Sequence, residues 1–359
     1  MRSLSVWARF KRWASSHPKI SIGLTVAMAL LAIGTVAAAI IYPSPQSIVN
    51  IISGQKPVSD AAPTKFYSPL TGVEVADQNA TKQQVRAIMI ENSPTARPQS
   101  GIKDAGIVFE AIAEGGITRF LTLHQEDAPA LIGPVRSVRP YYIDWLAAFD
   151  ASVSHVGGSA NALAEVRNGQ YKDDDQFFNA KYYWRANDRP APHNVYTNTK
   201  NIVDMNNSKG YTSSTFTGWP RKQDGPSDAP TAQKINIAIS GPLYDVHYDY
   251  DKGNNNYIRA EGGAKHVDRE AGQIAPKVVI AMKVQTQIGF EDGYREQMTT
   301  IGSGTAYVFQ DGTVTEATWS KTGKKDQIFF YDKLGHQIPF NRGQTWITVT
   351  APEKSVTWQ

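Results

Sequence analysis

The sequence predicts an N-terminal transmembrane helix, then an α/β (α+β) domain, then a mainly β C-terminal domain. Three observations support this fold class. Residues 20–42 carry no charged side chain, residues 65–205 mix strand-like and helix-like runs, and residues 234–359 alternate apolar and polar side chains as strands do. A chain of 359 residues is long enough for two domains of ordinary size.

The N-terminal residues predict a single-pass membrane anchor. Residues 1–19 form a basic tail, and the uncharged run 20–42 would span about 34 Å as a helix, enough to cross a bilayer. The basic residues precede this run, so we expect the N-terminus in the cytoplasm and the body outside. A signal peptide cleaved near Ala37 to Ala39 is the alternative. Residues 43–64 are rich in Pro, Ser and Gln and predict a linker.

The composition excludes several classes of site and partner. The chain has no cysteine, which excludes disulfides, thiolate metal sites, cysteine nucleophiles and lipid attached through cysteine. Subtracting the five basic residues of the tail from the 37 Lys and Arg leaves 32, against 33 Asp and Glu. The body is therefore near neutral, and we expect no nucleic-acid partner. We predict no cofactor, and no metal site because the available ligands follow no metal-binding spacing.

The first charged stretch of interest is a predicted hairpin within residues 107–139. Two strand-like runs, 107–113 and 117–123, are joined across Gly115 and Gly116, which is typical of a two-residue hairpin. With Glu114 opposite Ile117, regular pairing predicts Glu110, Glu114 and Arg119 on one face of the sheet. These side chains form either a polar site or a simple ladder of ion pairs.

The remaining elements are assigned in order along the chain. We expect strands at 85–91 and 151–156, helices beginning at Pro140, Ala160 and Thr199, a junction at 206–233, and short strands after residue 234. Gly133-Pro134 places Arg136 and Arg139 in a loop before the first of these helices, where two guanidinium groups can bind one anion. The alternative is that these arginines pair with Glu110, Glu114 or Asp144 and only stabilise the fold.

The sequence also contains the residue types of a hydrolytic triad. His155, Ser159 and Asp144 are such a set, but no nucleophile elbow surrounds the serine, and Ser159 is expected to cap a helix. Glu110 and Glu114 would lie roughly 13 Å apart on a regular strand, too far for a pair of glycosidase carboxylates.

Several runs resemble the bacterial YerB-like envelope proteins, the domain-of-unknown-function family 3048. The resemblance lies in ARPQSGIKDAGIVFEAIAEGGITRF, IGPVRSVRPYYIDW, HVGGS, WR, APHN, GTAYVFQDGTVTEATWSK and GQTWITVTAPE. It implies an N-terminal and a C-terminal YerB-like domain outside the membrane, with no assigned activity. It supports a polar signature of Arg97, Glu110, Glu114, Arg119, Arg136, Arg139, His155, His193 and Asn194. Many relatives look like lipoproteins, whereas this chain lacks the required cysteine.

From these observations we expect a membrane-anchored, extracytoplasmic binding or scaffold protein of the cell envelope. Its N-terminal domain would present an Arg/Glu/His cleft to an anionic glycan, peptide or protein partner, and its ligand-binding residues would be those of the polar signature together with Ser159. One alternative is an envelope hydrolase or transferase with Glu110 or Glu114 as acid/base, assisted by His155 or His193. Another is a buried charge network without a ligand.

Overall fold

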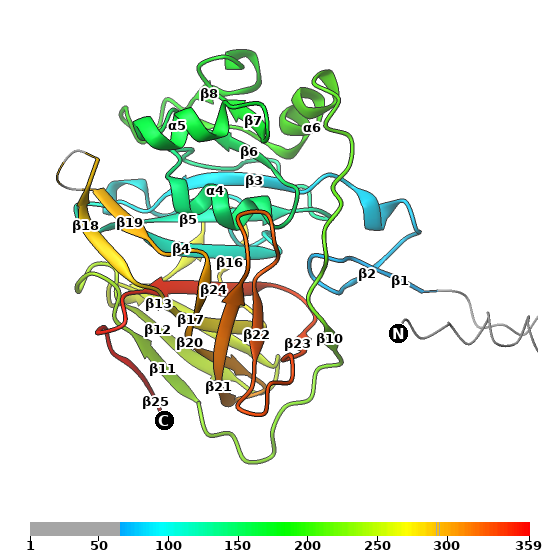
Figure 1. Ribbon diagram of the computed structural model, residues 1–359, viewed down its shortest axis with the longest axis vertical. Helices are drawn as coiled ribbons and strands as arrows, with labels where there is room; N and C mark the ends of the chain where they lie inside the picture. Colours follow the sequence, from blue (N-terminus) through cyan, green and yellow to red (C-terminus); the bar gives the residue numbers. More distant parts are fainter. Residues whose placement is uncertain (1–64, 292, 294) are drawn as a thin grey trace, which may run out of the picture. The chain divides into compact units, whose positions relative to one another are not determined.

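The main feature of the described residues is a sheet of twelve strands. The computed structural model describes residues 65–291, 293 and 295–359 (Figure 1). The strands of this sheet are β3 (Arg86–Glu91), β4 (Ile107–Glu114), β5 (Ile117–His124), β6 (Ser152–His155), β7 (Lys172–Asp175), β17 (Val278–Lys283), β18 (Thr286–Phe290), β19 (Arg295–Met298), β20 (Gly302–Gln310), β21 (Thr313–Lys321), β22 (Phe329–Tyr331) and β24 (Thr345–Thr350). Their order is β22-β21-β20-β17-β24-β4-β5-β3-β6-β7, and β19 joins β18 to β4.

A second sheet has five strands in the order β14-β13-β12-β11-β25. These strands are β11 (Lys234–Ile237), β12 (Val246–Asp251), β13 (Asn256–Glu261), β14 (Ala264–Lys265) and β25 (Val356–Trp358). The remaining strands are β1 (Phe66–Tyr67), β2 (Glu74–Val75), β8 (Trp184–Arg185), β9 (Val195–Tyr196), β10 (Arg221–Lys222), β15 (Val267–Asp268), β16 (Gly272–Gln273) and β23 (Phe340–Asn341). The second sheet packs Ile235, Ile237 and Tyr248 against Val279 and Phe309 of the large sheet.

The described part of the chain contains three short α-helices. They are α4 (Pro140–Ala147), α5 (Ala160–Val166) and α6 (Thr199–Ser208), with single 3-10 turns η1 (Ala80–Lys82), η2 (Pro94–Ala96) and η3 (Ala180–Tyr182). Proline at the first position suits the start of α4, since its missing N–H has no helical partner to lose. Ser159 and Asn198 accept backbone hydrogen bonds at the starts of α5 and α6. The three predicted helix starts are confirmed.

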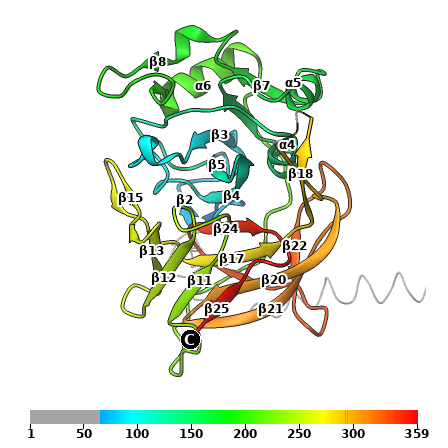
Figure 2. The ribbon, with the colours of Figure 1, turned by 90° about the vertical axis from the view of Figure 1, so that its left-hand side faces the viewer.

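The two parts of the chain meet in the middle of the large sheet. β24, from the last residues of the chain, runs parallel to β4 with Thr345 opposite Ile107, and parallel to β17 with Thr345 opposite Val278. Figure 2 shows β24 between β4 and β17. The large sheet therefore contains strands from both predicted domains, 65–205 and 234–359, joined by continuous backbone hydrogen bonding.

The predicted fold class was wrong. The structure is mostly β, and it holds no separate α/β domain, because the strands of residues 65–205 belong to the same sheet as β17, β20, β21, β22 and β24. The helices are too short and few to form a layer of their own. Within residues 65–291, 293 and 295–359, no helix is long and apolar enough to cross a membrane. The transmembrane helix expected at 20–42 and the linker at 43–64 lie outside the described residues.

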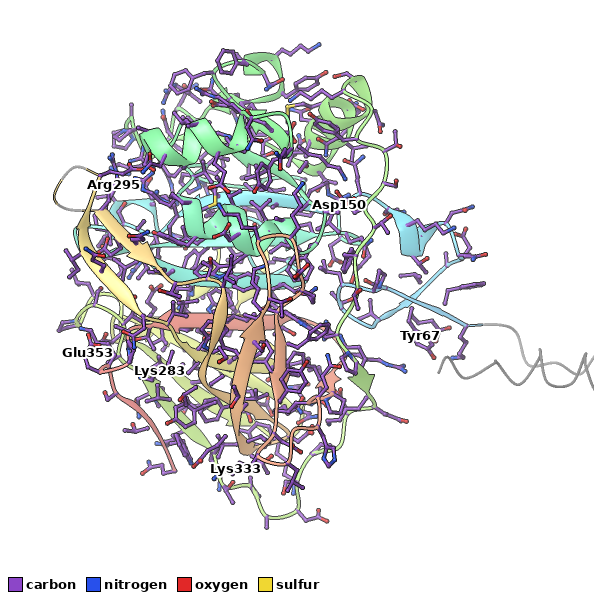
Figure 3. The ribbon with its side chains drawn as sticks, viewed as in Figure 1. Tyr67, Asp150, Lys283, Arg295, Lys333 and Glu353 are labelled. Carbon is purple, nitrogen blue, oxygen red and sulfur yellow. The ribbon has the colours of Figure 1, made fainter. Side chains whose placement is uncertain are left out.

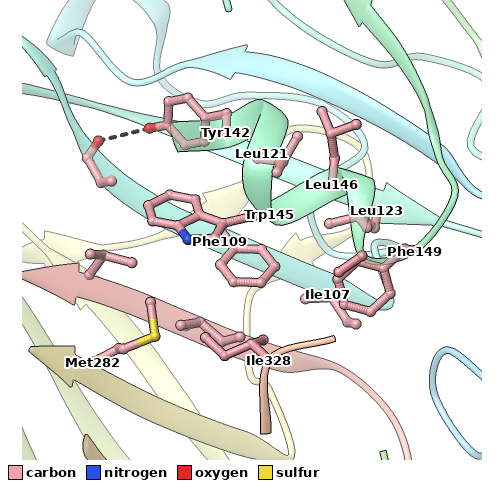
Figure 4. Close-up of a cluster of buried hydrophobic side chains, with 14 of the residues drawn as sticks. Ile107, Phe109, Leu121, Leu123, Tyr142, Trp145, Leu146, Phe149, Met282 and Ile328 are labelled. Carbon is pink, nitrogen blue, oxygen red and sulfur yellow. Dashed lines mark hydrogen bonds between the residues drawn. The ribbon is translucent and has the colours of Figure 1, made fainter. Parts of the chain in front are cut away.

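The largest hydrophobic core lies where α4 packs on the large sheet (Figure 4). Phe109 of β4 stacks on Trp145 of α4, with ring centroids 5.3 Å apart and planes 10° from parallel. The Tyr142 hydroxyl donates to the carbonyl oxygens of Ala111 and Arg119 at 3.0 and 2.8 Å. These contacts hold α4 against β4 and β5, and so place the residues just before α4 beside the tip of the hairpin.

The variant Phe109→Ala tests this core. Truncating a fully buried phenylalanine removes its transfer free energy and leaves a cavity, so we expect the free energy of unfolding to fall by about 3 to 5 kcal/mol. Urea denaturation followed by tryptophan fluorescence measures the change. The matched control is Phe178→Ala, because Phe178 is 73% exposed. Equal effects of the two substitutions would contradict this description of the core.

Candidate functional site

The β4–β5 hairpin contains a bulge that the sequence pattern did not predict. Gly115 and Gly116 have positive φ values of 57° and 77°, and Glu114 pairs with Ile117 as expected. The register then shifts between Ile112 and Glu114, so that Arg119 pairs with Ala111 and Phe120 with Glu110. A single extra residue reverses which face the preceding side chains occupy. The prediction that Glu110 shares a face with Glu114 and Arg119 was therefore wrong.

On one face, Glu114 is surrounded by arginines, a group that we call the arginine cluster. Arg119 Nη2 lies 3.2 Å from Glu114 Oε1, Arg139 Nη2 contacts Oε2, and Arg295 Nε lies 3.6 Å from Oε2. Burial alone would raise the pKa of Glu114, but Arg119 and Arg139 outweigh it and hold that pKa below its usual range. Glu114 is thus ionised at neutral pH.

The arginine cluster has more positive than negative charge at its buried end. Within the part of the chain that the structure describes, Glu114 is the only carboxylate in an ion pair with Arg119 or Arg139. Arg119 also donates to the carbonyl oxygen of Ser137, and Arg139 to that of Val138, each at 2.8 Å. The Nε atom of each arginine donates no hydrogen bond to any residue that the structure describes. Burial, and to a lesser extent the neighbouring Arg119, lowers the pKa of Arg139, whereas Glu114 opposes this shift.

A second group adjoins the arginine cluster on the same face, because Glu91 of β3 pairs directly with Arg119 of β5. We call it the Glu91 cluster. Glu91 lies 3.2 Å from Arg136 Nε and 2.9 Å from His193 Nδ1, and it accepts a hydrogen bond of 3.1 Å from Ser93. Arg136 and His193 therefore lie together as predicted for one polar site, around a glutamate that the sequence analysis treated only as the end of a strand.

On the opposite face, Glu110 belongs to a fully buried network that we call the Arg259 network. Arg259 Nη2 donates to Glu110 Oε2 at 2.7 Å, and neither side chain is exposed to solvent. The indole N–H of Trp346 and the hydroxyl of Thr348 also donate to this oxygen, at 3.0 and 3.3 Å. The guanidinium lies over the Trp346 ring, 4.3 Å from its centroid. Glu110 is thus held inside the protein.

The Arg259 network reaches a surface cavity of about 250 Å³ through Glu261 and His266. Arg259 donates to His266 Nδ1, so this nitrogen is the acceptor and the ring is neutral, and burial next to Arg259 lowers the His266 pKa well below its usual value. The other ring nitrogen lies 3.3 Å from Gln99 Oε1. Arg97, one of the predicted site residues, pairs with Glu261 at 3.1 Å.

Three further residues of the predicted site contact neither Glu114 nor Glu91, although Ser159 is linked to Arg295 through Glu291. His155 is buried, with its ring nitrogens 2.8 Å from Gly157 O and 2.8 Å from Asp173 Oδ1. Ser159 caps α5 and donates to Glu291 at 3.1 Å. Asn194 accepts from Arg185 at 2.8 Å. His155, Ser159 and Asp144 share no hydrogen bond, since Asp144 bonds to Thr300, and this geometry forms no catalytic triad.

The predicted site residues thus fall into separate groups. The arginine cluster and the Glu91 cluster share one sheet face and contain Glu114, Arg119, Arg136, Arg139 and His193. The other face holds Glu110 and Arg97. The sequence analysis missed Glu91, Arg259, Glu261, His266 and Arg295. The alternation of Arg259 and Glu261 along β13 places both on one face, but no local signal identifies Glu110 as their partner.

Comparisons with known proteins give one consistent result. Family models described as protein of unknown function (DUF3048), N-terminal and C-terminal domain, match residues 70–212 and 235–347. The chain is 32% identical over 299 residues to the Bacillus subtilis (strain 168) protein named "Putative lipoprotein YerB", which covers 81% of this chain and 88% of that protein. The crystal structure of the YerB protein from Bacillus subtilis is similar, with a TM-score of 0.74 and 30% identity, over 82% of this chain and 100% of that chain.

The variant Glu261→Gln tests the charge balance of the Arg259 network. Burial raises the pKa of Glu261 to about 7, although Arg259 opposes the shift. The folded protein then binds more protons than the unfolded chain between pH of about 4.5 and 7, so stability falls as pH rises through this window. We expect the free energy of unfolding of the variant to depend less on pH there than that of the wild type.

Urea titrations at pH 5, 6 and 7.5 measure this dependence. The exposed Glu316→Gln on β21 is the matched control and should keep the wild-type slope. Parallel curves for wild type and Glu261→Gln would show that Glu261 does not titrate in this range.

Proposed function

This chain belongs to the DUF3048 family, as its motifs predicted, and we propose that it is an extracytoplasmic, membrane-attached binding protein of the cell envelope. The name of its relative, "Putative lipoprotein YerB", supports attachment to a membrane, although this chain has no cysteine that could carry a lipid. The proposed ligand is a carboxylate or phosphate group of an anionic cell-wall glycan, and the proposed binding surface consists of the arginine cluster and the Glu91 cluster.

One observation carries this proposal: Arg119 and Arg139 share a single carboxylate, Glu114, in a poorly hydrated position. A buried cation that is incompletely neutralised favours the approach of an anion, because the alternative partner, water, is mostly excluded. Guanidinium groups match the geometry of carboxylate and phosphate oxygens.

Two partly exposed arginines would make the first contact with such a ligand. The side chains of Arg136 and Arg295 are 23% and 22% exposed, whereas Arg119 and Arg139 lie deeper. The outer pair would contact the anion directly, and the inner pair would attract it over a longer range through a medium of low dielectric constant.

The geometry favours binding over acid–base catalysis by the two predicted glutamates. Glu110 has no exposed surface and is bonded by Arg259, so a substrate has no access to it. The arginines keep Glu114 ionised, which suits an ion-pair partner and not a general acid at neutral pH.

The binding proposal is tested by the double variant Arg136→Ala/Arg295→Ala. Each lost charge-assisted bond is worth about 1.5 to 3 kcal/mol, so we expect the affinity of the purified chain for isolated cell-wall glycan to fall at least about tenfold. Cosedimentation at several salt concentrations measures it, since screening should weaken the wild type more than the variant.

The control for this experiment is Lys333→Ala, which removes one cation from an exposed pair with Glu316. Figure 3 labels Arg295 and Lys333 at distant places on the molecule. Unchanged affinity of the folded double variant would remove the proposed role of these arginines. Loss of binding to an envelope protein, with glycan binding unaffected, would instead identify a protein partner.

The proposed location has its own test. When intact cells are treated with a protease that does not cross the membrane, the region 65–359 should be cleaved, while a cytoplasmic marker protein stays whole. Protection of this region until the cells are lysed would contradict the extracytoplasmic assignment.

A further inference from the structure

A second cavity, of about 390 Å³, lies beside α4 and next to the arginine cluster, since its lining residues Pro140 and Glu296 directly follow Arg139 and Arg295 in the chain. Its walls come from the start of α4, from α5, from β19 with the loop that follows it, and from the loop between β21 and β22. Its lining is Pro140, Tyr141, Asp144, Asn161, Glu165, Glu296, Gln297, Met298, Thr299, Thr300, Ile301 and Lys324. A volume of this size suits a small ligand or one side chain of a larger one.

The polar wall of this cavity is acidic and incompletely bonded. Asp144 and Glu296 are only 8% and 5% exposed. Asp144 Oδ2 accepts a hydrogen bond of 2.5 Å from Thr300, but Asp144 Oδ1 and Glu296 Oε2 accept none within the described ranges of the chain. Burial raises the pKa of both carboxyl groups, as expected for anions that lack sufficient partners. Buried oxygen atoms of this kind favour a ligand that donates hydrogen bonds.

The cavity already contains one ammonium group. Lys324, half-exposed on the loop between β21 and β22, pairs with Glu165 and lies 3.5 Å from Asp144 Oδ1. Its neighbour Lys321 donates to the backbone carbonyl oxygens of Lys324 and Asp326, and therefore points to backbone atoms of its own loop. No ion pair joins Lys324 or Lys321 to Glu296 within residues 65–291, 293 and 295–359. Glu296 is thus the carboxylate of this wall that neither lysine pairs with, and the nearby charge of Arg139 partly opposes the effect of burial on its pKa.

A single metal ion is a poor match for this wall. Metal ions need several ligand atoms within about 2 to 2.6 Å of one point. No group of three or more His, Asp or Glu side chains in the described residues is close enough together to hold one. The rest of the wall is apolar, with Pro140, Tyr141, Met298 and Ile301 beside the carboxylates. A ligand that combines an alkyl chain with a cationic end fits both the apolar and the acidic part of the cavity wall.

We propose that this cavity binds a primary alkylammonium group, such as that of a lysine side chain or a free alkylamine. The ammonium donates to Glu296 Oε2, and the alkyl chain packs on Tyr141 and Met298. Lys324 already pairs with Glu165 and lies near Asp144, so its ammonium group competes with the ligand for the acidic wall of the cavity. The proposal does not depend on the anionic ligand of the arginine cluster, since it uses none of those side chains.

The test uses n-butylamine and Nα-acetyl-lysine amide as probes of the purified full chain, with 1-butanol as the uncharged control. Saturation-transfer NMR titrations measure the dissociation constants at neutral pH. Glu296→Gln should weaken binding of both amines at least about tenfold, because it removes a charged hydrogen-bond acceptor. Lys324→Ala should strengthen binding, because it removes the competing ammonium. Glu316→Gln, an exposed glutamate on β21, should leave binding unchanged.

The two cavity variants change affinity in opposite directions, which a general loss of folding cannot produce. Equal binding of 1-butanol and n-butylamine would overturn the proposal, as would amine binding that is unaffected by Glu296→Gln. Binding of the free amine without the lysine derivative would identify a small molecule as the ligand, and binding of both would identify a lysine-bearing partner.

Discussion

The buried ion pair between Glu110 and Arg259 is the interaction on which the rest of the structure depends. Neither side chain reaches water, so their desolvation must be offset by short and numerous contacts. Trp346 supplies an indole N–H and a ring face, Thr348 a hydroxyl, and the neutral His266 an acceptor. These residues come from β4, β13, β24 and the loop before β15, so the pair joins the two sheets and both parts of the chain. Removing one partner would leave an uncompensated charge in the core.

The same hairpin that anchors this pair also presents the arginine cluster, and the bulge separates the two roles. Glu110 lies before the bulge and faces Arg259, whereas Glu114 lies after it and faces Arg119 and Arg139. The Glu110 carboxylate is therefore neutralised and buried, whereas the Glu114 carboxylate lies at the edge of an arginine-rich surface. Glu110, which holds the structure together, and Glu114, which belongs to the proposed binding surface, are four residues apart in sequence but lie on opposite faces of the sheet.

Sequence reasoning succeeded where a local pattern determines the structure. The Gly115-Gly116 turn and the helix starting at Pro140 were both predicted from neighbouring residues. It failed where the outcome depends on distant residues. No turn residue marks the bulge. The pattern of apolar and polar residues in β4 and in β24 does not indicate that these two strands pair. For this reason the fold class was wrong, and Arg259, the partner of Glu110, was missed.

The parallel pairing of β24 with β4 has a consequence for the order in which the protein folds. Ile107 meets Thr345, so a central strand of the large sheet is supplied by residues that are synthesised long after β4. Until then β4 and β17 each have an unpaired edge, and unpaired edges can associate with other chains. Contacts so distant in sequence also form slowly. The N-terminal part of the chain therefore cannot complete the large sheet without residues 345–350.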